Sequence, residues 1–336
     1  MNTFSNRLTI VVLAIGFVVS GSATTTLKIA TISPDNSVIV ENLRTASDNL
    51  FARTDGEVKL KIYANGVMGD DLTVKRKIRA RQLQGGIVAT QVFATEVPDL
   101  NLYNLPLQFK DLDEVSVVRQ EFDSWVKQQF DNTNFVPIGF IGIGFAYAMS
   151  TKPFDTVEET YSLKIWTPKD DRIADHTLRT FGTSPIPLTV VDVLPNLQTG
   201  LIDTIASPPV AAIALQWHAQ VKYILNIPFT YVYIVFVLDR RSFNRLTEFA
   251  QEILLEELQE VVITSEVQLY KDQDDAFSAM QDHGMELLDP NPDSLNRWNQ
   301  AAKKAIDQMR KKGYIPEDPY RKLQEVLQDY RTQSSR

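Results

Sequence analysis

The sequence of 336 residues contains no cysteine. This absence excludes disulfide bonds, thiol catalysis and a lipid-modified cysteine at the start of a mature chain. Histidine is scarce as well, because the chain has three widely separated histidines, and neither a paired-histidine motif nor a Gly-x-Ser-x-Gly sequence is present. These absences argue against a hydrolase. We therefore expect a protein that is not an enzyme and that needs no metal or cofactor.

Positive charge is in the minority. The 34 lysines and arginines face 42 aspartates and glutamates, so the formal net charge is −8. An acidic chain of this kind lacks the electrostatic footprint of nucleic-acid binding. One basic cluster stands out at residues 75–81, within a helix that we expect at residues 70–84. This cluster fits contact with a membrane partner or an anionic ligand, although a solvated helix face is the simpler interpretation.

Long hydrophobic runs are also missing. The N-terminal apolar segment, residues 8–19, follows Arg7 and precedes the small residues Gly21-Ser22-Ala23. It is about a dozen residues long, whereas a membrane span needs roughly 20. The pattern predicts a signal peptide over residues 1–23, cleaved to release a periplasmic product. A retained membrane anchor is the alternative.

Glycine and proline are absent between Pro228 and Gly284. Within this stretch, apolar residues of segment 248–281 recur at steps of three and four, as on one face of a helix. A helix of this length would measure roughly 50 Å, enough to cross two small domains. The alternative is a coiled-coil dimer helix, but polar residues such as Thr264 and Ser265 interrupt any heptad repeat.

The segment 163–209 alternates between the two kinds of secondary structure. We expect strands at residues 163–167, 186–191 and 201–206, and helices at residues 173–180 and 193–199, the second capped by Asp192. This order predicts a parallel sheet with helices on its faces. Ligands of such sheets bind at the carboxyl ends of the strands, which is where Trp166 and Ser207 stand.

Two further strands, at residues 136–150 and 229–238, are expected to cross between two lobes and to act as hinges around a cleft. Phe145, Tyr147 and Met149 form the bulky face of the first strand, opposite a small face. In the second strand, Phe229, Tyr231 and Tyr233 share a face. We assign residues 24–146 and 233–272 to lobe I, and residues 147–232 and 273–336 to lobe II. Two final helices, at residues 294–313 and 319–330, are expected to pack on lobe II.

Several short motifs occur in a characteristic order along the chain. They are Gly66-Val67-Met68-Gly69, Leu105-Pro106-Leu107, Ser150-Thr151-Lys152-Pro153, Gly182-Thr183-Ser184-Pro185 and Leu197-Gln198-Thr199-Gly200. Together they resemble the substrate-binding proteins of TRAP (tripartite ATP-independent periplasmic) transporters, of the dicarboxylate-binding class. The resemblance implies an α/β fold of two lobes, each a mostly parallel sheet flanked by helices, with hinge strands and one long helix spanning both lobes. It also implies capture of a small-molecule ligand and delivery to the small and large membrane subunits.

The chain departs from this family at the ligand-binding position. In most members the position of Trp166 holds an arginine that grips the ligand carboxylate through a two-pronged salt bridge. Without that clamp, we expect an apolar or aromatic ligand in place of a small dicarboxylate. Alternatively, Trp166 fills the core, or Arg172 or Arg179 supplies a relocated cation. The candidate ligand-binding residues are Trp166, Ser207, Trp217, Phe145, Tyr147, Gln216, Tyr231, Tyr233 and Asp170.

A narrower resemblance rests on four short motifs, Lys164-Ile165-Trp166, Asp170-Asp171, Ser207-Pro208-Pro209 and Gln216-Trp217-His218. Their combination is similar to a TRAP subgroup associated with hydrophobic ligands and with a periplasmic tetratricopeptide-repeat partner. A different class of function also remains open. The same fold could serve a periplasmic sensor or scaffold that presents a ligand-dependent surface to a signalling partner.

Overall fold

The computed structural model describes residues 24–334, and the predicted signal peptide lies outside the described residues. Within residues 24–334, no helix has both the length and the apolar character needed to span a membrane. The helices are α1 (Val38–Arg53), α2 (Asp71–Arg79), α3 (Leu112–Gln129), α4 (Arg172–Thr180), α5 (Val190–Gln198), α6 (Pro209–Ala214), α7 (Arg240–Phe243), α8 (Glu248–Asp282), α9 (Pro292–Lys311) and α10 (Glu317–Ser334). The strands are β1 (Thr25–Thr31), β2 (Val58–Tyr63), β3 (Gly85–Ala89), β4 (Phe135–Ser150), β5 (Trp166–Pro168), β6 (Ile186–Leu188), β7 (Thr204–Ser207), β8 (Tyr223–Leu225), β9 (Thr230–Asp239) and β10 (Glu286–Leu288).

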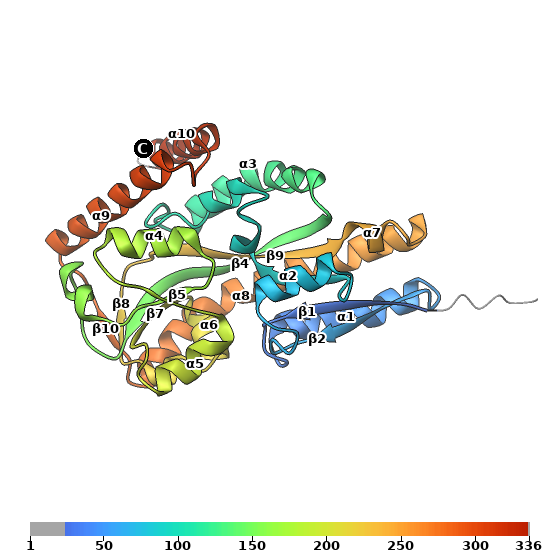
Figure 1. Ribbon diagram of the computed structural model, residues 1–336, viewed down its shortest axis with the longest axis horizontal. Coiled ribbons are helices and arrows are strands. Elements are labelled where there is room, and N and C mark those ends of the chain that lie inside the picture. Colours follow the sequence, from blue (N-terminus) through green and yellow to red (C-terminus); the bar gives the residue numbers. More distant parts are fainter. Residues whose placement is uncertain (1–23, 335–336) are drawn as a thin grey trace, which may run out of the picture.

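The strands form two lobes that share β4 (Figure 1). The order is β10-β8-β4-β9-β3-β1-β2, with β7 also paired to β4, and β5 and β6 form a separate parallel pair. Up to Ala146, β4 pairs with β9 of lobe I, and from Tyr147 it pairs with β7 of lobe II. The α/β fold of two lobes is therefore confirmed. The exact division of the chain between the lobes stays a prediction.

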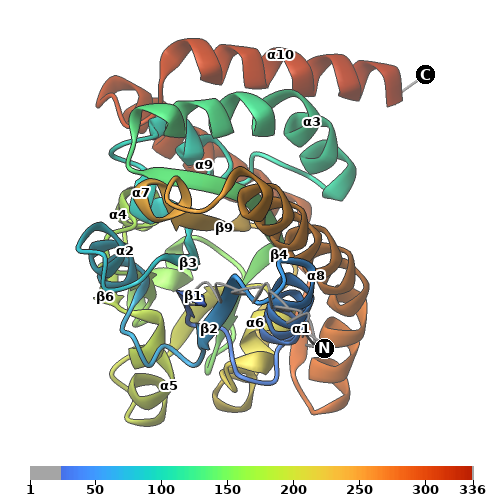
Figure 2. The same ribbon diagram turned by 90° about the vertical axis from the view of Figure 1, so that its right-hand side faces the viewer.

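The predicted long helix is confirmed as α8, which begins after its N-cap Thr247. Residues of its first half, such as Leu258, join the core with α1 and β4 of lobe I, and Met280 near its end joins the core with α6 of lobe II. Figure 2 shows α8 running along one side of the molecule past both lobes. Buried leucines such as Leu43 of α1 and Leu258 of α8 join the core on this face of the lobe I sheet.

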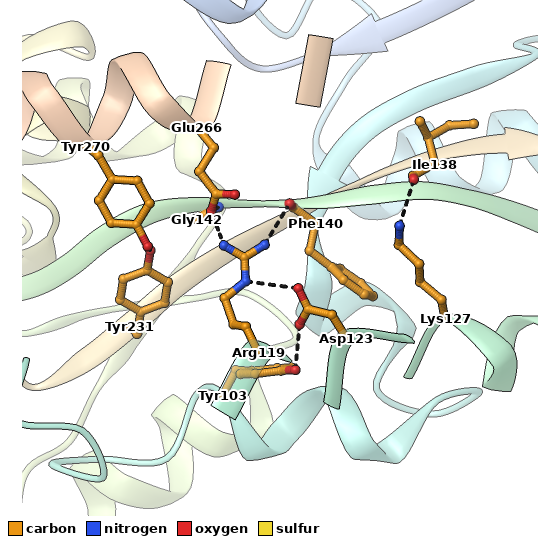
Figure 3. A network of polar contacts seen from close by, with 10 residues as sticks. All are labelled: Tyr103, Arg119, Asp123, Lys127, Ile138, Phe140, Gly142, Tyr231, Glu266 and Tyr270. Carbon is orange, nitrogen blue, oxygen red and sulfur yellow. Dashed lines mark hydrogen bonds and ion pairs between the residues drawn. The ribbon is translucent and has the colours of Figure 1, made fainter. Parts of the chain in front are cut away.

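A partly buried network of charges ties α8 and α3 to the crossing strand β4 (Figure 3). The guanidinium of Arg119 on α3 contacts the carboxylates of Glu266 on α8 and of Asp123, the latter at 2.9 Å. Glu266 also accepts the backbone N–H of Gly142 at 2.7 Å. Just beyond, β4 has a bulge between Gly142 and Gly144, and Gly144 adopts φ +125°. The network therefore holds β4 in place where its pairing is irregular, next to the crossing between lobes.

The C-terminal helices differ from the prediction. Helix α9 packs on α4 of lobe II, as expected, but α10 returns to lobe I and packs on α3. There Arg331 forms a two-pronged salt bridge at 2.7 Å with Glu114, a carboxylate that is 2% exposed. Leu323 and Leu327 of α10 join the lobe I core. The prediction for α10 was wrong because an amphipathic helix does not reveal which lobe its apolar face covers.

Smaller differences concern boundaries in the segment 163–209. Asp192 does not cap α5, because the helix begins earlier, after Thr189, whose hydroxyl donates to Asp192 at 2.6 Å. The predicted parallel order holds for β5 and β6 and for an isolated bridge from Ile165 to Thr204. Strand β7 itself, however, runs antiparallel to β4. The lobe II sheet is therefore mixed.

Candidate functional site

A cavity of about 140 Å³ lies between the two lobes. Lobe I contributes Gln91, Asn104 and Pro106, and the crossing strands contribute Ala148 and Thr230 among others. Most of the remaining wall comes from lobe II. Its residues are Phe154, Thr160, Ile165, Trp166, Pro168, Asp171, Ala174, Thr177, Leu178, Phe181, Thr183, Thr204, Ile205, Ala206 and Trp298, while Phe229 and Val232 complete the lining. The position between lobes is the one expected for the ligand of a two-lobed binding protein.

The crossing strands face the cavity with their small side chains. Ala148 of β4 and Thr230 and Val232 of β9 line it, whereas Tyr231 and Tyr233 are fully buried on the other face of β9. There the Tyr231 hydroxyl donates to that of Tyr270 on α8 at 2.9 Å (Figure 3). The sequence analysis chose the large aromatic side chains of these two strands as ligand contacts. The cavity instead lies against their smaller side chains, which leave room for it.

Trp166 lies in the cavity wall and is 6% exposed. Its indole N–H donates to the backbone carbonyl of Leu188 at 3.0 Å, so the donor is already used within the chain. The ring of Trp217 packs edge-to-face against it, with centroids 5.2 Å apart. Trp166 therefore offers the cavity an apolar surface, and Trp217 supports it as part of the same hydrophobic cluster.

The other candidate residues lie elsewhere in the described chain and do not belong to this lining. Phe145 packs on Tyr231, and Tyr147 on Phe277, in each case edge-to-face. Ser207 is buried, and its hydroxyl donates to the carbonyl of Pro208 at 3.1 Å. Gln216 and Asp170 are exposed and adopt positive φ angles in turns. A ligand role for these residues stays a prediction.

Asp171 follows Asp170, one of the predicted ligand-binding residues. Among the described lining residues, Asp171 supplies the one carboxyl group. It caps α4 by accepting the N–H of Ala174 at 2.9 Å. Burial raises the pKa of Asp171, while hydrogen bonds from Ala174 and Gln91 act in the opposite direction. The described lining contains no lysine, arginine or histidine. Nor do the described residues include a cluster of three acidic, histidine or cysteine side chains suited to a metal ion.

Several residues of the cavity wall were not among the candidates. Trp298 of α9 donates its indole N–H to the carbonyl of Asp155 at 2.8 Å. Its ring packs edge-to-face on Phe181 and Phe229, with centroids 5.4 and 5.0 Å apart. Phe229 had been placed on the face of Tyr231, but it precedes β9 and lines the cavity. A single sequence offers no sign that residues so far apart along the chain meet.

The two lobes also approach each other just after β6, where Gly66 faces Val191. A Cβ atom added to Gly66 of lobe I would lie 2.9 Å from Cγ1 of Val191 on α5. We expect Gly66→Leu to hold the lobes apart and thereby to raise the radius of gyration measured by small-angle X-ray scattering. The left-handed φ of +66° adds a backbone strain of about 1–2 kcal/mol, visible in thermal unfolding.

Gly200→Leu is the matched control. Gly200 has a similar φ of +71°, but a Cβ atom there would meet nothing within 4 Å. The two variants should therefore lose similar stability, while the radius of gyration should rise for Gly66→Leu alone. An unchanged radius in both variants would show that the contact with Val191 does not limit closure.

The comparison with known families places most of this chain in one of them. Residues 29–312 match the family described as bacterial extracellular solute-binding protein, family 7. Among curated proteins, the sialic acid-binding periplasmic protein SiaP of Vibrio cholerae is 22% identical over 261 residues, which cover 76% of this chain and 80% of SiaP.

Solved structures share the fold. The sugar acid binding protein DctPAm of Advenella mimigardefordensis, in complex with galactonate, superposes with a TM-score of 0.84 at 13% identity and covers 92% of this chain and 99% of its own. A TRAP periplasmic solute-binding protein of Sulfurospirillum deleyianum with bound succinate gives 0.83 at 18% identity, covering 90% and 98%. With two lobes, a cavity between them and a family match over residues 29–312, the chain belongs to family 7 of the bacterial extracellular solute-binding proteins.

Proposed function

We propose that this protein captures an uncharged, largely apolar organic ligand between its lobes and delivers it to the membrane subunits of a TRAP-type transporter. The observation that carries the proposal is the charge of the cavity wall. Its described residues include one carboxyl group, that of Asp171, and no cationic side chain. Removal of apolar area from water, worth about 25 cal/mol per Å², is then the main source of affinity.

The relatives point to a different kind of ligand, and the contrast is informative. SiaP is named for sialic acid, and the two solved structures hold galactonate and succinate, all of which are acids. A buried carboxylate needs a paired cation. In this chain the nearby cations are engaged elsewhere or exposed: Arg179 pairs with Asp175 at 2.8 Å, Lys312 contacts His176 at 3.4 Å, and Arg172 is exposed. An anionic ligand would also face the carboxyl group of Asp171.

Two finer points belong to the same proposal. Trp166 in place of the family's arginine supports assignment to the subgroup with hydrophobic ligands, whose members work with a tetratricopeptide-repeat partner. Export to the periplasm, with cleavage after residue 23, is proposed from the apolar segment at the N-terminus. A sensor or scaffold role is the second candidate. Neighbouring genes for two membrane subunits would indicate uptake, whereas a neighbouring histidine kinase would indicate sensing.

Native mass spectrometry of the protein exported from bacterial cells tests the proposal. We expect a mass that shows loss of residues 1–23, together with a retained neutral organic ligand. After solvent has removed this ligand, succinate and galactonate are expected to leave the melting temperature unchanged. Stabilisation by either acid would contradict the proposal and would indicate a relocated cation.

A further inference from the structure

Four residues of the cavity lining each carry a buried polar atom without a hydrogen-bond partner. The atoms are Gln91 Oε1, Asn104 Nδ2, Thr177 Oγ1 and Thr230 Oγ1, and all four side chains belong to the described lining. Buried polar groups in folded proteins are nearly always paired, so each exception calls for an explanation. Because these four come from both lobes and from a crossing strand and still meet at one cavity, a shared partner inside the cavity is the simplest explanation.

Gln91 lies beside Asp171 in the cavity wall. Asp171 accepts the N–H of Ala174 at 2.9 Å and a hydrogen bond from the side chain of Gln91. In this pair the amide of Gln91 donates through its NH₂ group. This orientation leaves the carbonyl oxygen of Gln91 without a partner, as the structure shows. Gln91 therefore requires a hydrogen-bond donor from the ligand.

The other unpaired groups add different requirements. Asn104, which is 7% exposed, has a free NH₂ group and so requires an acceptor from the ligand. The hydroxyls of Thr177 on α4 and of Thr230 at the start of β9 can each donate or accept. The rest of the wall is mainly apolar and includes the rings of Phe181 and Trp298. The cavity lining thus combines a few polar groups with a mainly apolar wall.

Building on the proposed function, we propose that the ligand is an uncharged molecule whose polar group carries a hydrogen-bond donor beside an acceptor, as a primary carboxamide or a lactam does, on a compact apolar body. A carboxylate would offer no donor to Gln91 and would face Asp171. An ammonium group would leave Asn104 without an acceptor. A plain hydrocarbon would leave all four polar atoms unpaired.

Titration calorimetry on the mature protein, after removal of any bound ligand, tests this inference. The three probes are benzene rings that each carry one small substituent. Benzamide carries the donor and the acceptor, benzoate carries a charge, and toluene carries neither. The cavity of about 140 Å³ suits a benzene ring, since an engineered apolar cavity of about 150 Å³ binds benzene. We expect benzamide to bind about tenfold or more tightly than toluene, because a buried polar group left unpaired is unfavourable, and benzoate to bind most weakly.

Variants assign the effect to particular atoms. Asn104→Leu should weaken benzamide binding about tenfold and leave toluene binding unchanged or stronger. Thr177→Val and Thr183→Val form a matched pair, because both threonines line the cavity but the hydroxyl of Thr183 is already paired with the carbonyl of Leu178 at 2.8 Å. The loss of benzamide affinity is expected for Thr177→Val and not for Thr183→Val. This isosteric pair keeps the test sound even if Asn104→Leu does not fold.

The outcomes separate this inference from the proposed function. Toluene binding as tightly as benzamide would overturn the inference and leave an uncharged apolar ligand intact. Equal losses in Thr177→Val and Thr183→Val, or no benzamide binding at millimolar concentration, would also overturn it. Tighter binding of benzoate than of both other probes would overturn the inference and the proposed function together.

Discussion

Replacing Trp166 by alanine is expected to lower the free energy of unfolding by about 3–5 kcal/mol. The indole is 6% exposed, packs edge-to-face on Trp217 and donates a hydrogen bond to the carbonyl of Leu188. Its removal leaves a void that the surrounding cluster can fill only in part. Because the same void opens into the cavity between the lobes, benzamide binding should fall as well. Urea unfolding and titration calorimetry measure the two losses.

Trp217→Ala is the matched control, since it removes the other ring of the same pair. Trp217 is 3% exposed but does not line the cavity as described, so its loss should lower stability by a similar amount and affect benzamide binding much less. If both variants lost the same affinity, Trp166 would act through the core alone. If Trp166→Ala left stability unchanged, the packing described for the pair would be wrong.

Much of the fold was predictable because it rests on local patterns. The long helix α8 follows from the absence of glycine and proline, together with apolar residues at steps of three and four. The crossing strands β4 and β9 agree with their predictions to within a residue at each end. Periodicity is a property of neighbouring residues, and it therefore survives in a single sequence. The lobe that α10 covers depends on contacts far along the chain, and it was missed.

The candidate site was less predictable for the same reason. Large aromatic residues drew attention to Tyr231 and Tyr233, yet these rings fill the space behind β9. The cavity faces the small side chains of the same strands. Two of its polar residues follow β3, Gln91 in a short 3-10 helix and Asn104 in a turn. Large side chains in a sequence most often fill the core, whereas a cavity forms where side chains leave space. Trp166 was found through its position in a family motif.

The stability of this protein is expected to fall as the pH rises from about 4 to about 8, with Asp71 as a main cause. Its carboxyl group is buried in the first turn of α2, and one oxygen has no partner. Burial raises the pKa of Asp71 to about 7, although a hydrogen bond from the backbone of Ala89 acts in the opposite direction. In the unfolded chain an aspartate has a pKa of about 3.9.

The sign of the effect follows from proton binding. Between about pH 4 and pH 7 the folded protein keeps the proton on Asp71 and the unfolded chain has lost it, so raising the pH favours unfolding. The contribution is fully present below about pH 4 and is lost as the pH rises through the folded pKa of about 7. Three pKa units correspond to about 4 kcal/mol, which is an order-of-magnitude figure for a buried group.

Asp71→Asn isolates this contribution, because it keeps the shape of the side chain and removes its titration. Urea unfolding at a series of pH values should show a slope in the wild type that is much smaller in Asp71→Asn, and the variant should be the more stable protein at pH 8. Asp70→Asn is the control, and it should keep most of the slope, because the charge of Asp70 raises the pKa of Asp71 less than burial does. Asp70 is half-buried and caps α2 by accepting the N–H of Thr73 at 2.7 Å, a role that asparagine also performs. Parallel pH profiles for the wild type and Asp71→Asn would mean that water reaches this carboxyl group.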